Sequence, residues 1–415
     1  MSRLLQKYKE IRLSHGKVHS ILIMTYIICH KLIEKLYVKY LLHFGKLDLT
    51  VVVFESSPDY SDNSRALSDY MINNGYLEKY KIYWSVSNAS YCRSLNRNAQ
   101  VVFLQNVDKF GEHKLSNVKK FMTAGVLLGT HNIVWSYKDS IKGQRHIRLW
   151  HGCGYKAPSD TDKRSFRTFD FGCVIGPFFV KVFSYYWNVE EKYVHPTGFA
   201  RYDWLKTKSL KAIAYKERIL GDSSKLLIWM PTFRNDKLGR YNSLESFAGF
   251  PLLQDQLDWE RFDELCVRLK IKILVKLHIF QKDYSIDYSK FKNIHLINNE
   301  DLDQKGINLY ELLAVTDGLI SDYSSVAFDY LIVDKPMAFA LDDYDNYVHS
   351  RGFAFDNPKH YMPGHHLYSL EDLGKFVREV ASGIDLHSAW RREIRKDAIT
   401  ESDCYCRDIL TAINI

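Results

Sequence analysis

Residues 318–356 read GLISDYSSVAFDYLIVDKPMAFALDDYDNYVHSRGFAFD. The apolar run Gly318–Ser321 predicts a short strand, and the apolar stripe of Val326–Val333 predicts the start of a helix. The polar turn Asp322–Ser325 lies between them. Such a turn presents backbone N–H groups, hydroxyl groups and the positive end of a helix dipole at one point, which suits an anion. An ordinary N-cap is the alternative, because Ser and Asp are favoured capping residues.

Apolar runs of strand length alternate with helical patterns along most of the chain, as in doubly wound α/β folds. The first series of predicted strands comprises Leu49–Phe54, Lys81–Val86, Gln100–Leu104, Gly125–Gly129, His146–Trp150 and Phe171–Ile175. A second series comprises Leu226–Met230, Ile271–Leu277, Asn293–Ile297, Gly318–Ser321 and Pro336–Ala340. Helical patterns fill the gaps, for example in Ser64–Asn73, Phe178–Trp187 and the Lys-rich linker Lys206–Lys225.

We therefore predict an α/β protein with two Rossmann-like, doubly wound domains facing a cleft, the architecture called GT-B. The predicted limits are residues 47–205 for the first domain and residues 206–415 for the second. With 415 residues and 46% hydrophobic content, the chain can bury two cores. The seven cysteines form no C-x-x-C pair and have no ligand-spaced His, which argues against a zinc site or a disulfide framework and favours a reducing cytoplasm.

The positive charge is concentrated at the N-terminus. Residues 1–46 hold nine Lys or Arg against two Glu, a net charge of +7, whereas the whole chain carries +8. A nucleic-acid-binding protein would spread its basic residues over the binding domain, so this class is disfavoured.

Val18–His30 is a charge-free run of 13 residues between the basic clusters. It is shorter than the ~20 apolar residues that cross a bilayer, and it lacks the small-residue cleavage site of a signal peptide. We expect residues 1–46 to form a basic helical segment that lies on an anionic membrane surface. Packing of this helix on the protein's own core is the alternative.

The opening stretch carries a recognisable set of residues at fixed spacing. They are Ser321, Asp322, Tyr323, Ser324, Ser325, Phe328, Asp329, Lys335, Pro336, Tyr347, Arg351 and Gly352. In these residues the chain resembles the CDP-glycerol glycerophosphotransferase family, whose members build teichoic-acid-like polymers of polyol phosphate. The resemblance extends over roughly residues 50–365.

A second motif, WHGCGYK, follows the predicted strand His146–Trp150. It is similar to the family's H-G-T-P-x-K: His151, Gly152 and Lys156 match, and Cys153 and Gly154 depart from it. A His at the carboxyl end of a parallel strand lies where doubly wound folds bind ligands, and glycines let the backbone approach a ligand closely.

A third motif, PTGFARYDWL, is similar to the family's T-G-x-P-R-x-D-x-L, with Ala200 in place of Pro. Arg201 in this motif can bind two phosphate oxygens with its planar donors, and an interdomain salt bridge to an Asp is the alternative. The early segment Phe54-Glu55-Ser56 with Ser61-Asp62-Asn63 and Arg65 resembles the family's F-E-S and S-D-N-P-R, and we expect it to border the acceptor side.

Two further motifs end strands of the second domain. Pro231, Thr232 and Arg234 resemble the family's P-T-x-R, and Lys276 and His278 resemble its K-x-H-P, with Ile279 in place of Pro. Because the carboxyl ends of parallel strands meet at one edge, we expect these groups to gather near Ser324 and Ser325 around a pyrophosphate.

The resemblance implies that a hydroxyl of a lipid-linked acceptor attacks the β-phosphorus of CDP-glycerol and releases CMP. The first domain would then hold the acceptor and the second the CDP-polyol donor. The implied catalytic residues are His151, as general base, and His278. The implied donor-binding residues are Gly152, Lys156, Arg201, Pro231, Thr232, Arg234, Lys276, Ser324, Ser325 and Asp329. Asp329 could instead cap its helix or pair with Lys335.

No cofactor or metal is expected. Asp342, Asp343 and Asp345 lack the glycine and distal Glu of an EF-hand, so we interpret them as solvated. The expected partners are CDP-glycerol or CDP-ribitol, a lipid-linked saccharide or polyol-phosphate acceptor and an anionic membrane. The expected location is the cytoplasmic face of the membrane, peripherally bound, in teichoic acid or capsule synthesis.

Several alternatives stay open at this point. A CDP-ribitol ribitolphosphotransferase would share the fold and the motifs, and a primase and a polymerase are not separated by them. A GT-B nucleotide-sugar glycosyltransferase or epimerase would keep the nucleotide but act on a sugar. A non-catalytic membrane adaptor would be expected to have lost the cations at the strand ends, which are present here.

Overall fold

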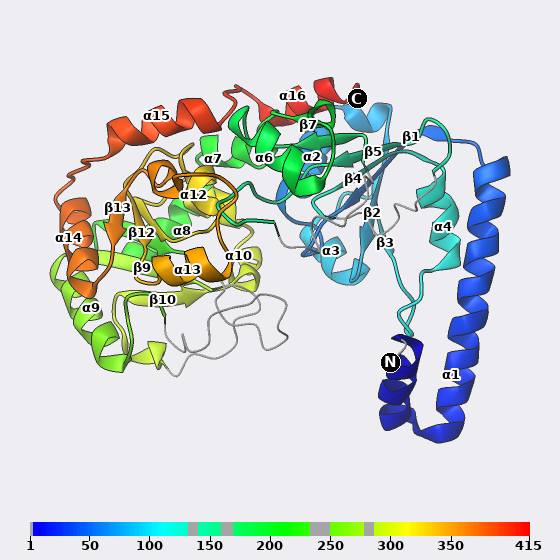
Figure 1. Ribbon diagram of the computed structural model, residues 1–415, viewed down its shortest axis with the longest axis horizontal. Helices are drawn as coiled ribbons and strands as arrows, with labels where there is room; N and C mark the ends of the chain where they lie inside the picture. The colour runs from blue at the N-terminus through cyan, green and yellow to red at the C-terminus, as the bar shows by residue number, and fades with distance from the viewer. Residues whose placement is uncertain (1–2, 132–139, 159–168, 233–249, 278–285) are drawn as a thin grey trace. The chain divides into compact units, whose positions relative to one another are not determined.

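The structure is a computed structural model that describes residues 3–131, 140–158, 169–232, 250–277 and 286–415. The chain forms two compact units, Met1–Trp150 with Thr168–Gly172 and His151–Arg167 with Cys173–Ile415. Figure 1 shows the sheets and helices of which the units are built. The domain limits 47–205 and 206–415 stay a prediction, and each unit is described by itself.

The first sheet has the strand order β3-β2-β1-β4-β5-β6-β7. Its strands are β1 (Asp48–Glu55), β2 (Lys81–Val86), β3 (Val101–Gln105), β4 (Ala124–Gly129), β5 (Arg145–Arg148), β6 (Phe171–Cys173) and β7 (Val194–His195). The pairs from β3 to β6 are parallel. Val51–Phe54 in β1 is buried on both faces, which explains why this central strand is continuously apolar. The order reverses between β1 and β4, the kind of point where doubly wound sheets bind ligands.

The described part of the first unit contains the helices α1 (Arg3–Phe44), α2 (Asp62–Asn73), α3 (Ala89–Leu95) and α4 (Leu115–Met122). A 3₁₀ turn, Tyr76–Glu78, follows α2. The helix α4 packs its apolar residues Val118, Phe121 and Met122 into a cluster with Val51 and Val53 of β1. This cluster is the core on one side of the first sheet.

The second sheet has the order β10-β9-β8-β11-β12-β13, and all its pairs are parallel. Its strands are β8 (Lys225–Trp229), β9 (Ile271–Lys276), β10 (Ile294–Ile297), β11 (Gly318–Ser321), β12 (Met337–Ala340) and β13 (His365–Leu367). Here the order reverses between β8 and β11. Trp229, Phe250 and Trp259 pack with their rings 4.7–6.1 Å apart in a core that α9 and α14 share.

Helices connect and cover the strands of the second unit. They are α6 (Phe178–Trp187), α7 (Tyr202–Lys206), α8 (Leu210–Leu220), α9 (Gln256–Arg268), α10 (Asn299–Gln304), α11 (Leu309–Leu313), α12 (Val326–Tyr330), α13 (Tyr344–Ser350), α14 (Leu370–Ala381), α15 (Ser388–Ala398) and α16 (Tyr405–Ala412). In the described residues of this unit, 3₁₀ turns lie at Glu191–Tyr193, Tyr288–Lys290 and Pro358–Tyr361.

The predicted α/β fold with parallel sheets is confirmed, and each predicted strand is present within two residues at its ends. The strand predicted at His146–Trp150 ends two residues early, at Arg148, because Trp150 has a left-handed backbone conformation (φ 58°) that a strand excludes. The chain thus leaves the sheet just before the His-Gly motif.

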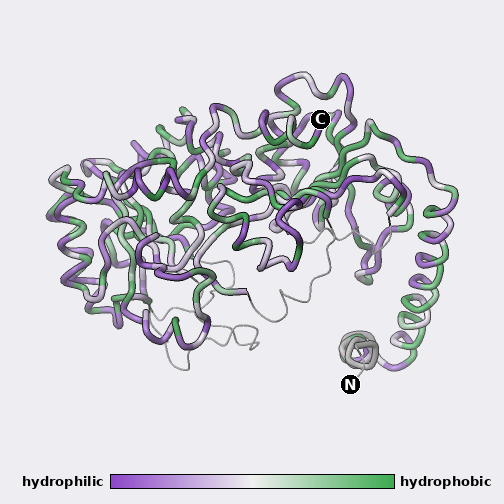
Figure 2. Tube along the Cα trace, turned by 45° about the horizontal axis from the view of Figure 1, so that its top comes forward, coloured by the Kyte–Doolittle hydropathy of each residue, from purple (hydrophilic) through white to green (hydrophobic). Residues whose placement is uncertain are grey.

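The basic N-terminal segment forms α1, which bends at Gly16, where the backbone adopts φ 74° (Figure 1). One face of α1 packs on α4 and buries Ile27, Val38 and Leu41. This packing agrees with the alternative that the helix lies on the protein's own core. Large apolar residues are nevertheless exposed along it: Leu13, Val18, Ile21, Leu22, Tyr26, Ile28, Leu32, Ile33, Leu36, Tyr40 and Phe44. Figure 2 shows hydrophobic and hydrophilic residues interleaved along the long part of this helix. Among the described residues, no helix combines the length and apolar character that crossing a bilayer requires.

Candidate active site

The Asp-Tyr-Ser-Ser turn of the second unit is tied to the end of the neighbouring strand β8. The carboxylate of Asp322, which is fully buried, accepts hydrogen bonds from the Thr232 backbone N–H at 3.0 and 2.8 Å and from the Thr232 hydroxyl. Ser321 Oγ donates to the Met230 carbonyl at 3.2 Å. The Pro231–Thr232 segment and the turn therefore form one rigid element at the point where the strand order reverses.

Ser325 starts α12 by position, but its side chain makes no capping hydrogen bond within the described chain. Ser324 and Ser325 are both half-buried. The ordinary capping explanation therefore does not account for the Ser325 hydroxyl. What the turn offers instead is two hydroxyl groups held at the carboxyl edge of the second sheet.

The His-Gly motif packs directly on this turn. A Cβ atom added to Gly152 would lie 2.4 Å from Ser325 Oγ and 2.9 Å from its Cβ. A Cβ added to Gly154 would lie 3.0–3.2 Å from the Cβ, Cα and N atoms of Ser325. Both glycines are thus required by the close approach of the two segments, and His151 is brought to the serine turn.

A buried ion pair connects the same two segments. Arg201 Nη2 donates to Asp329 Oδ2 at 2.6 Å, and both side chains are 1% exposed. Arg201 Nη1 donates to the His151 carbonyl at 2.9 Å. Arg201 therefore joins the His-Gly motif to α12, and an ion pair with an aspartate, one of the two interpretations of this arginine, is present.

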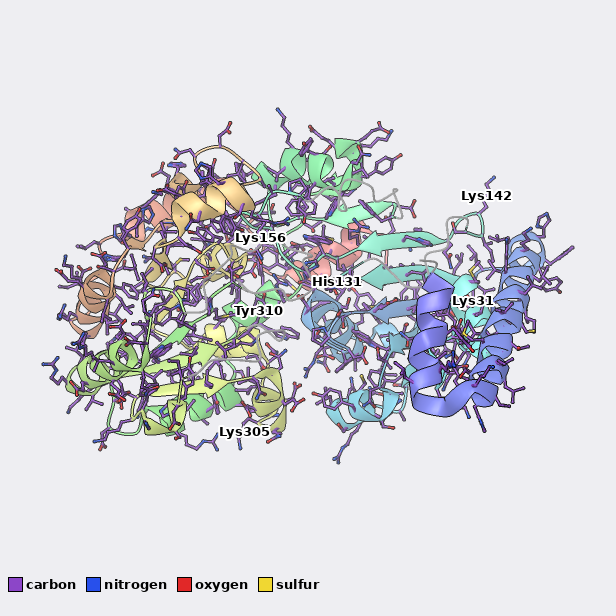
Figure 3. All side chains as sticks on the ribbon, turned by 60° about the horizontal axis from the view of Figure 1, so that its bottom comes forward. Lys31, His131, Lys142, Lys156, Lys305 and Tyr310 are labelled. Carbon is purple, nitrogen blue, oxygen red and sulfur yellow. The ribbon has the colours of Figure 1, made fainter. Side chains whose placement is uncertain are left out.

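Asp329 is the centre of this network. Besides Arg201, it accepts hydrogen bonds from the Tyr202 hydroxyl at 2.7 Å and from the Tyr310 hydroxyl at 2.9 Å. Tyr310, labelled in Figure 3, comes from α11. Asp329 pairs with Arg201 rather than with Lys335, so that alternative is wrong. Buried charge is satisfied here by three donors, as a carboxylate in a core requires.

The end of the His-Gly motif pairs with the segment after Arg351-Gly352. Lys156 (labelled in Figure 3) and Phe353 form an antiparallel bridge. Ala157 N–H donates to the Gly352 carbonyl at 3.2 Å, and Ala354 N–H donates to the Tyr155 carbonyl at 2.8 Å. The His-Gly motif and the Arg351-Gly352 end of the 318–356 stretch are therefore neighbours in the second unit.

One prediction in this region is wrong. Asp343, interpreted as solvated, is 2% exposed and accepts a hydrogen bond from the Tyr323 hydroxyl at 2.8 Å. Asp342 is half-buried, and its Oδ2 accepts from the Leu252 N–H at 3.0 Å, while Asp345 is exposed as predicted. The prediction failed because the sequence of an acidic run does not show which carboxylate will accept a hydrogen bond from a tyrosine elsewhere in the chain. Here Tyr323 provides that hydrogen bond, and Asp343 can therefore be buried.

The family model that matches this chain spans residues 37–403 and is described as CDP-glycerol:poly(glycerophosphate) glycerophosphotransferase. The chain belongs to the CDP-glycerol glycerophosphotransferase family. It is 26% identical over 388 residues, 85% of the chain and 47% of the relative, to a teichoic acid poly(glycerol phosphate) polymerase of Bacillus subtilis (strain 168). It is 24% identical over 351 residues, 76% of the chain and 79% of the relative, to a teichoic acid glycerol-phosphate transferase of Staphylococcus aureus (strain NCTC 8325 / PS 47).

The solved structures agree on the fold. A His-to-Asn variant of the wall teichoic acid polymerase TagF soaked with CDPG superimposes with a TM-score of 0.72 at 19% identity, covering 96% of this chain and 98% of that one. The chain shares the fold of TagF. It spans 34–47% of the length of the first four curated relatives it matches.

Of the glycerophosphotransferase site residues predicted from the sequence, the structure brings together His151, Gly152, Lys156, Arg201, Ser324, Ser325 and Asp329, and it joins Pro231 and Thr232 to the same turn through Asp322. Lys276 ends β9, where burial lowers the pKa of its ammonium group. Arg234 and His278 lie outside the described residues. Within the described ranges, no group of three or more His, Cys, Asp or Glu could hold a metal ion.

Two residues of the glycerophosphotransferase motif around Arg201, Gly198 and Asp203, contact the C-terminal helix α16. Asp203 accepts hydrogen bonds from the N–H groups of Tyr405 and Cys406 at 2.8 and 2.9 Å and so caps α16. Gly198 has φ 73°, and a Cβ atom there would lie 2.3 Å from the Tyr405 ring. Helix α16, which follows the end of the family match at residue 403, is thus anchored by two motif residues.

Sequence reasoning missed Tyr202 and Tyr310, which complete the Asp329 network. Tyr202 directly follows the motif residue Arg201, so its role in the site was predictable from its position. The sequence around Tyr310 contains no motif that would have predicted its contact with Asp329. It also missed His131 of the first unit, labelled in Figure 3, which follows β4. The ring of His131 lies 2.9 Å from Thr130 Oγ1, and burial lowers its pKa. A lone His after a short apolar run is too common a pattern to be singled out.

Proposed function

We propose that this chain transfers glycerol phosphate from CDP-glycerol to a hydroxyl of a lipid-linked acceptor or a growing polyol-phosphate chain, in teichoic acid or capsule-type polymer synthesis. The observation that carries this proposal is the packing of Gly152 and Gly154 on Ser325, which sets a motif histidine beside a serine turn. The family membership supports the same reaction.

In the proposed reaction, the acceptor oxygen forms a bond to the β-phosphorus of CDP-glycerol, and the bond between that phosphorus and the oxygen of CMP breaks. His151 takes the proton of the attacking hydroxyl, a role worth about 10²–10⁴ in rate. Positioning and neutralisation of phosphate charge account for most of the remaining acceleration in phosphoryl transfer. CMP leaves, and glycerol phosphate stays on the acceptor as a diester.

The donor's diphosphate would be held by Ser324, Ser325 and the turn's backbone, with positive charge from Lys156 and Lys276. We assign Arg201 and Asp329 a positioning role, because side chains that are 1% exposed have no surface left for a diphosphate. Their network supports the His151 backbone and α12. The roles of Arg234 and His278 stay predictions from the motifs.

CDP-ribitol is the second candidate donor. Several relatives are teichoic acid ribitol-phosphate polymerases, one of them 30% identical over 51% of this chain. The two donors share the nucleotide and the diphosphate and differ only in the polyol, so the contacts described here suit both.

We also propose that α1 binds the cytoplasmic face of an anionic membrane peripherally. Its exposed apolar residues, such as Leu22 (64%), Leu32 (63%) and Leu36 (62%), lie in a segment of net charge +7. Apolar side chains enter the headgroup boundary while each Lys or Arg contributes about 1 kcal/mol on an anionic surface. Such binding would bring the enzyme to a lipid-linked acceptor.

The proposed reaction is tested by CMP release. Purified chain is incubated with CDP-glycerol or CDP-ribitol, bacterial membranes and a synthetic prenyl-diphosphate disaccharide. We expect acceptor-dependent CMP release with one donor and, for His151→Ala, a loss of at least about 10²-fold in kcat because the proton acceptor is gone.

The control is His349→Ala, since His349 is exposed near the end of α13 and its ring binds the Asp345 carbonyl of its own helix. Circular dichroism shows whether both variants are folded. Full activity of the His151 variant would remove this residue as the base, and no release with either donor would overturn the proposed reaction.

A further inference from the structure

A cavity of about 480 Å³ lies in the first unit at the carboxyl ends of β1, β2 and β3. Glu55 ends β1, Ser85 lies near the end of β2, and Asn106 follows β3. This is the edge where doubly wound sheets bind ligands, and the volume is within the ~300–1,000 Å³ of small-molecule sites. The Phe54-Glu55-Ser56 segment, which the sequence predicts to border the acceptor side, contributes Glu55 and Ser56 to its lining.

The residues around the cavity are polar and carry no positive charge. Its lining includes the carboxylates of Glu55 and Asp59, several serine hydroxyls and the ring of Tyr91. Asp59 is held in place, since its Oδ2 accepts from the N–H groups of Ser87 and Asn88 at 2.7 and 2.8 Å. A phosphate would be repelled here, whereas hydroxyl groups could donate to the carboxylates.

Asn106 provides an independent indication of a ligand. Asn106 is only 9% exposed. Its side-chain oxygen Oδ1 is buried and accepts no hydrogen bond from the described chain. A buried acceptor in this state is unfavourable, because it has lost its hydrogen bonds to water and gained none from the protein. The backbone of Asn106 is fixed on both sides, by the Val86 carbonyl at 2.8 Å and the Lys114 N–H at 3.0 Å. A donor from a bound molecule would satisfy this oxygen.

We propose that this cavity binds the neutral, hydroxyl-rich end of the acceptor, either a terminal polyol or a sugar. This inference rests on the proposed function, because it makes the first unit the place where the attacking molecule is recognised. The lining suits this chemistry: carboxylate and amide oxygens accept from hydroxyls, and the Tyr91 ring covers C–H groups. The absence of cations from the lining residues separates it from the phosphate-binding edge of the second unit.

The test measures binding, so it does not depend on turnover. The full chain is titrated with two soluble probes, a glycerol-phosphate trimer and an N-acetylhexosamine disaccharide, by ligand-observed NMR. The variants are Asn106→Leu and Glu55→Gln, and the matched control is Gln100→Leu, an amide-to-leucine change at an exposed position of the same unit.

We expect one of the two probes to bind the wild type. The probe that binds shows whether the cavity recognises a polyol or a sugar. Its Kd should rise at least about tenfold in Asn106→Leu and in Glu55→Gln and stay unchanged in Gln100→Leu, because only the first two lose a lining acceptor. Affinity for CDP-glycerol should be equal in all four proteins. Asn106→Leu should not lower the melting temperature, since it removes an unsatisfied buried oxygen.

The proposal is overturned if neither probe binds the wild type, or if both cavity variants bind like the control. Should Asn106→Leu fail to fold, Glu55→Gln decides by itself. Probe binding together with no CMP release from either donor would support this cavity and count against the proposed transferase reaction, so the two failures are distinguishable.

Discussion

Arg201 and Asp329 lie 128 positions apart in the chain and form the buried pair on which the candidate site rests. The pair is not an isolated salt bridge, because Tyr202, Tyr310 and the His151 carbonyl complete its hydrogen bonds. A buried ion pair is expensive to desolvate, so its main effect is to define one arrangement of the groups it joins. Here it defines where the His-Gly motif meets α12.

Removing the carboxylate tests this network. Asp329→Ala would leave the Arg201 guanidinium buried without its counter-charge, and we expect a loss of about 3–5 kcal/mol in the free energy of unfolding of the second unit. Urea unfolding followed by circular dichroism measures it. The control, Asp345→Ala, removes an exposed carboxylate nearby and should change stability by at most about 0.5 kcal/mol. Equal stability of the two variants would contradict the assigned role.

At the scale of elements, α1 packs on the first unit with one face and leaves apolar side chains exposed on the others. Periodicity and charge indicated a helix with an apolar side and a basic character, but they did not separate contact with a membrane from contact with the protein's own core. The structure uses Ile27, Val38 and Leu41 for packing in the first unit. The remaining apolar side chains are exposed and are the ones we assign to the membrane.

The membrane proposal predicts a salt- and charge-dependent partition. The chain should sediment with vesicles that contain anionic lipid and much less with neutral vesicles, and added salt should weaken binding because it screens the basic residues. The double variant Leu22→Glu/Leu36→Glu should lose binding. The control is Leu210→Glu, which changes a leucine that lies outside α1 and is 83% exposed. This variant should bind the anionic vesicles as the wild type does. Normal binding of the double variant would exclude this face.

At the scale of the whole molecule, the carboxyl edges of two parallel sheets carry different chemistry. The edge in the second unit carries the hydroxyls of Ser324 and Ser325 and, at the end of β9, the ammonium group of Lys276. The edge in the first unit gathers carboxylates and an unsatisfied amide oxygen. This difference is consistent with a phosphate-bearing donor on one unit and a hydroxyl-bearing acceptor on the other, as proposed above.

Donor binding should stabilise the folded chain as a whole. At about 100 times its Kd, CDP-glycerol or CDP-ribitol adds about 2.7 kcal/mol, which for a chain of 415 residues corresponds to a rise of roughly 3 °C in the melting temperature. Differential scanning fluorimetry measures the shift, with UDP-glucose as the comparison nucleotide. A shift with UDP-glucose and none with either CDP-polyol would favour the nucleotide-sugar alternative.

The sequence by itself determined the parallel α/β fold, the family and the identity of the motif residues, because strand and helix periodicity and motif spacing are local properties of the chain. The tertiary structure alone decided which partners these residues take. That Arg201 binds Asp329, that Asp203 caps α16 and that Asp343 is buried under Tyr323 depends on packing between segments far apart in sequence. Burial then sets the cost of leaving a polar group unpaired, and this cost selects the partner.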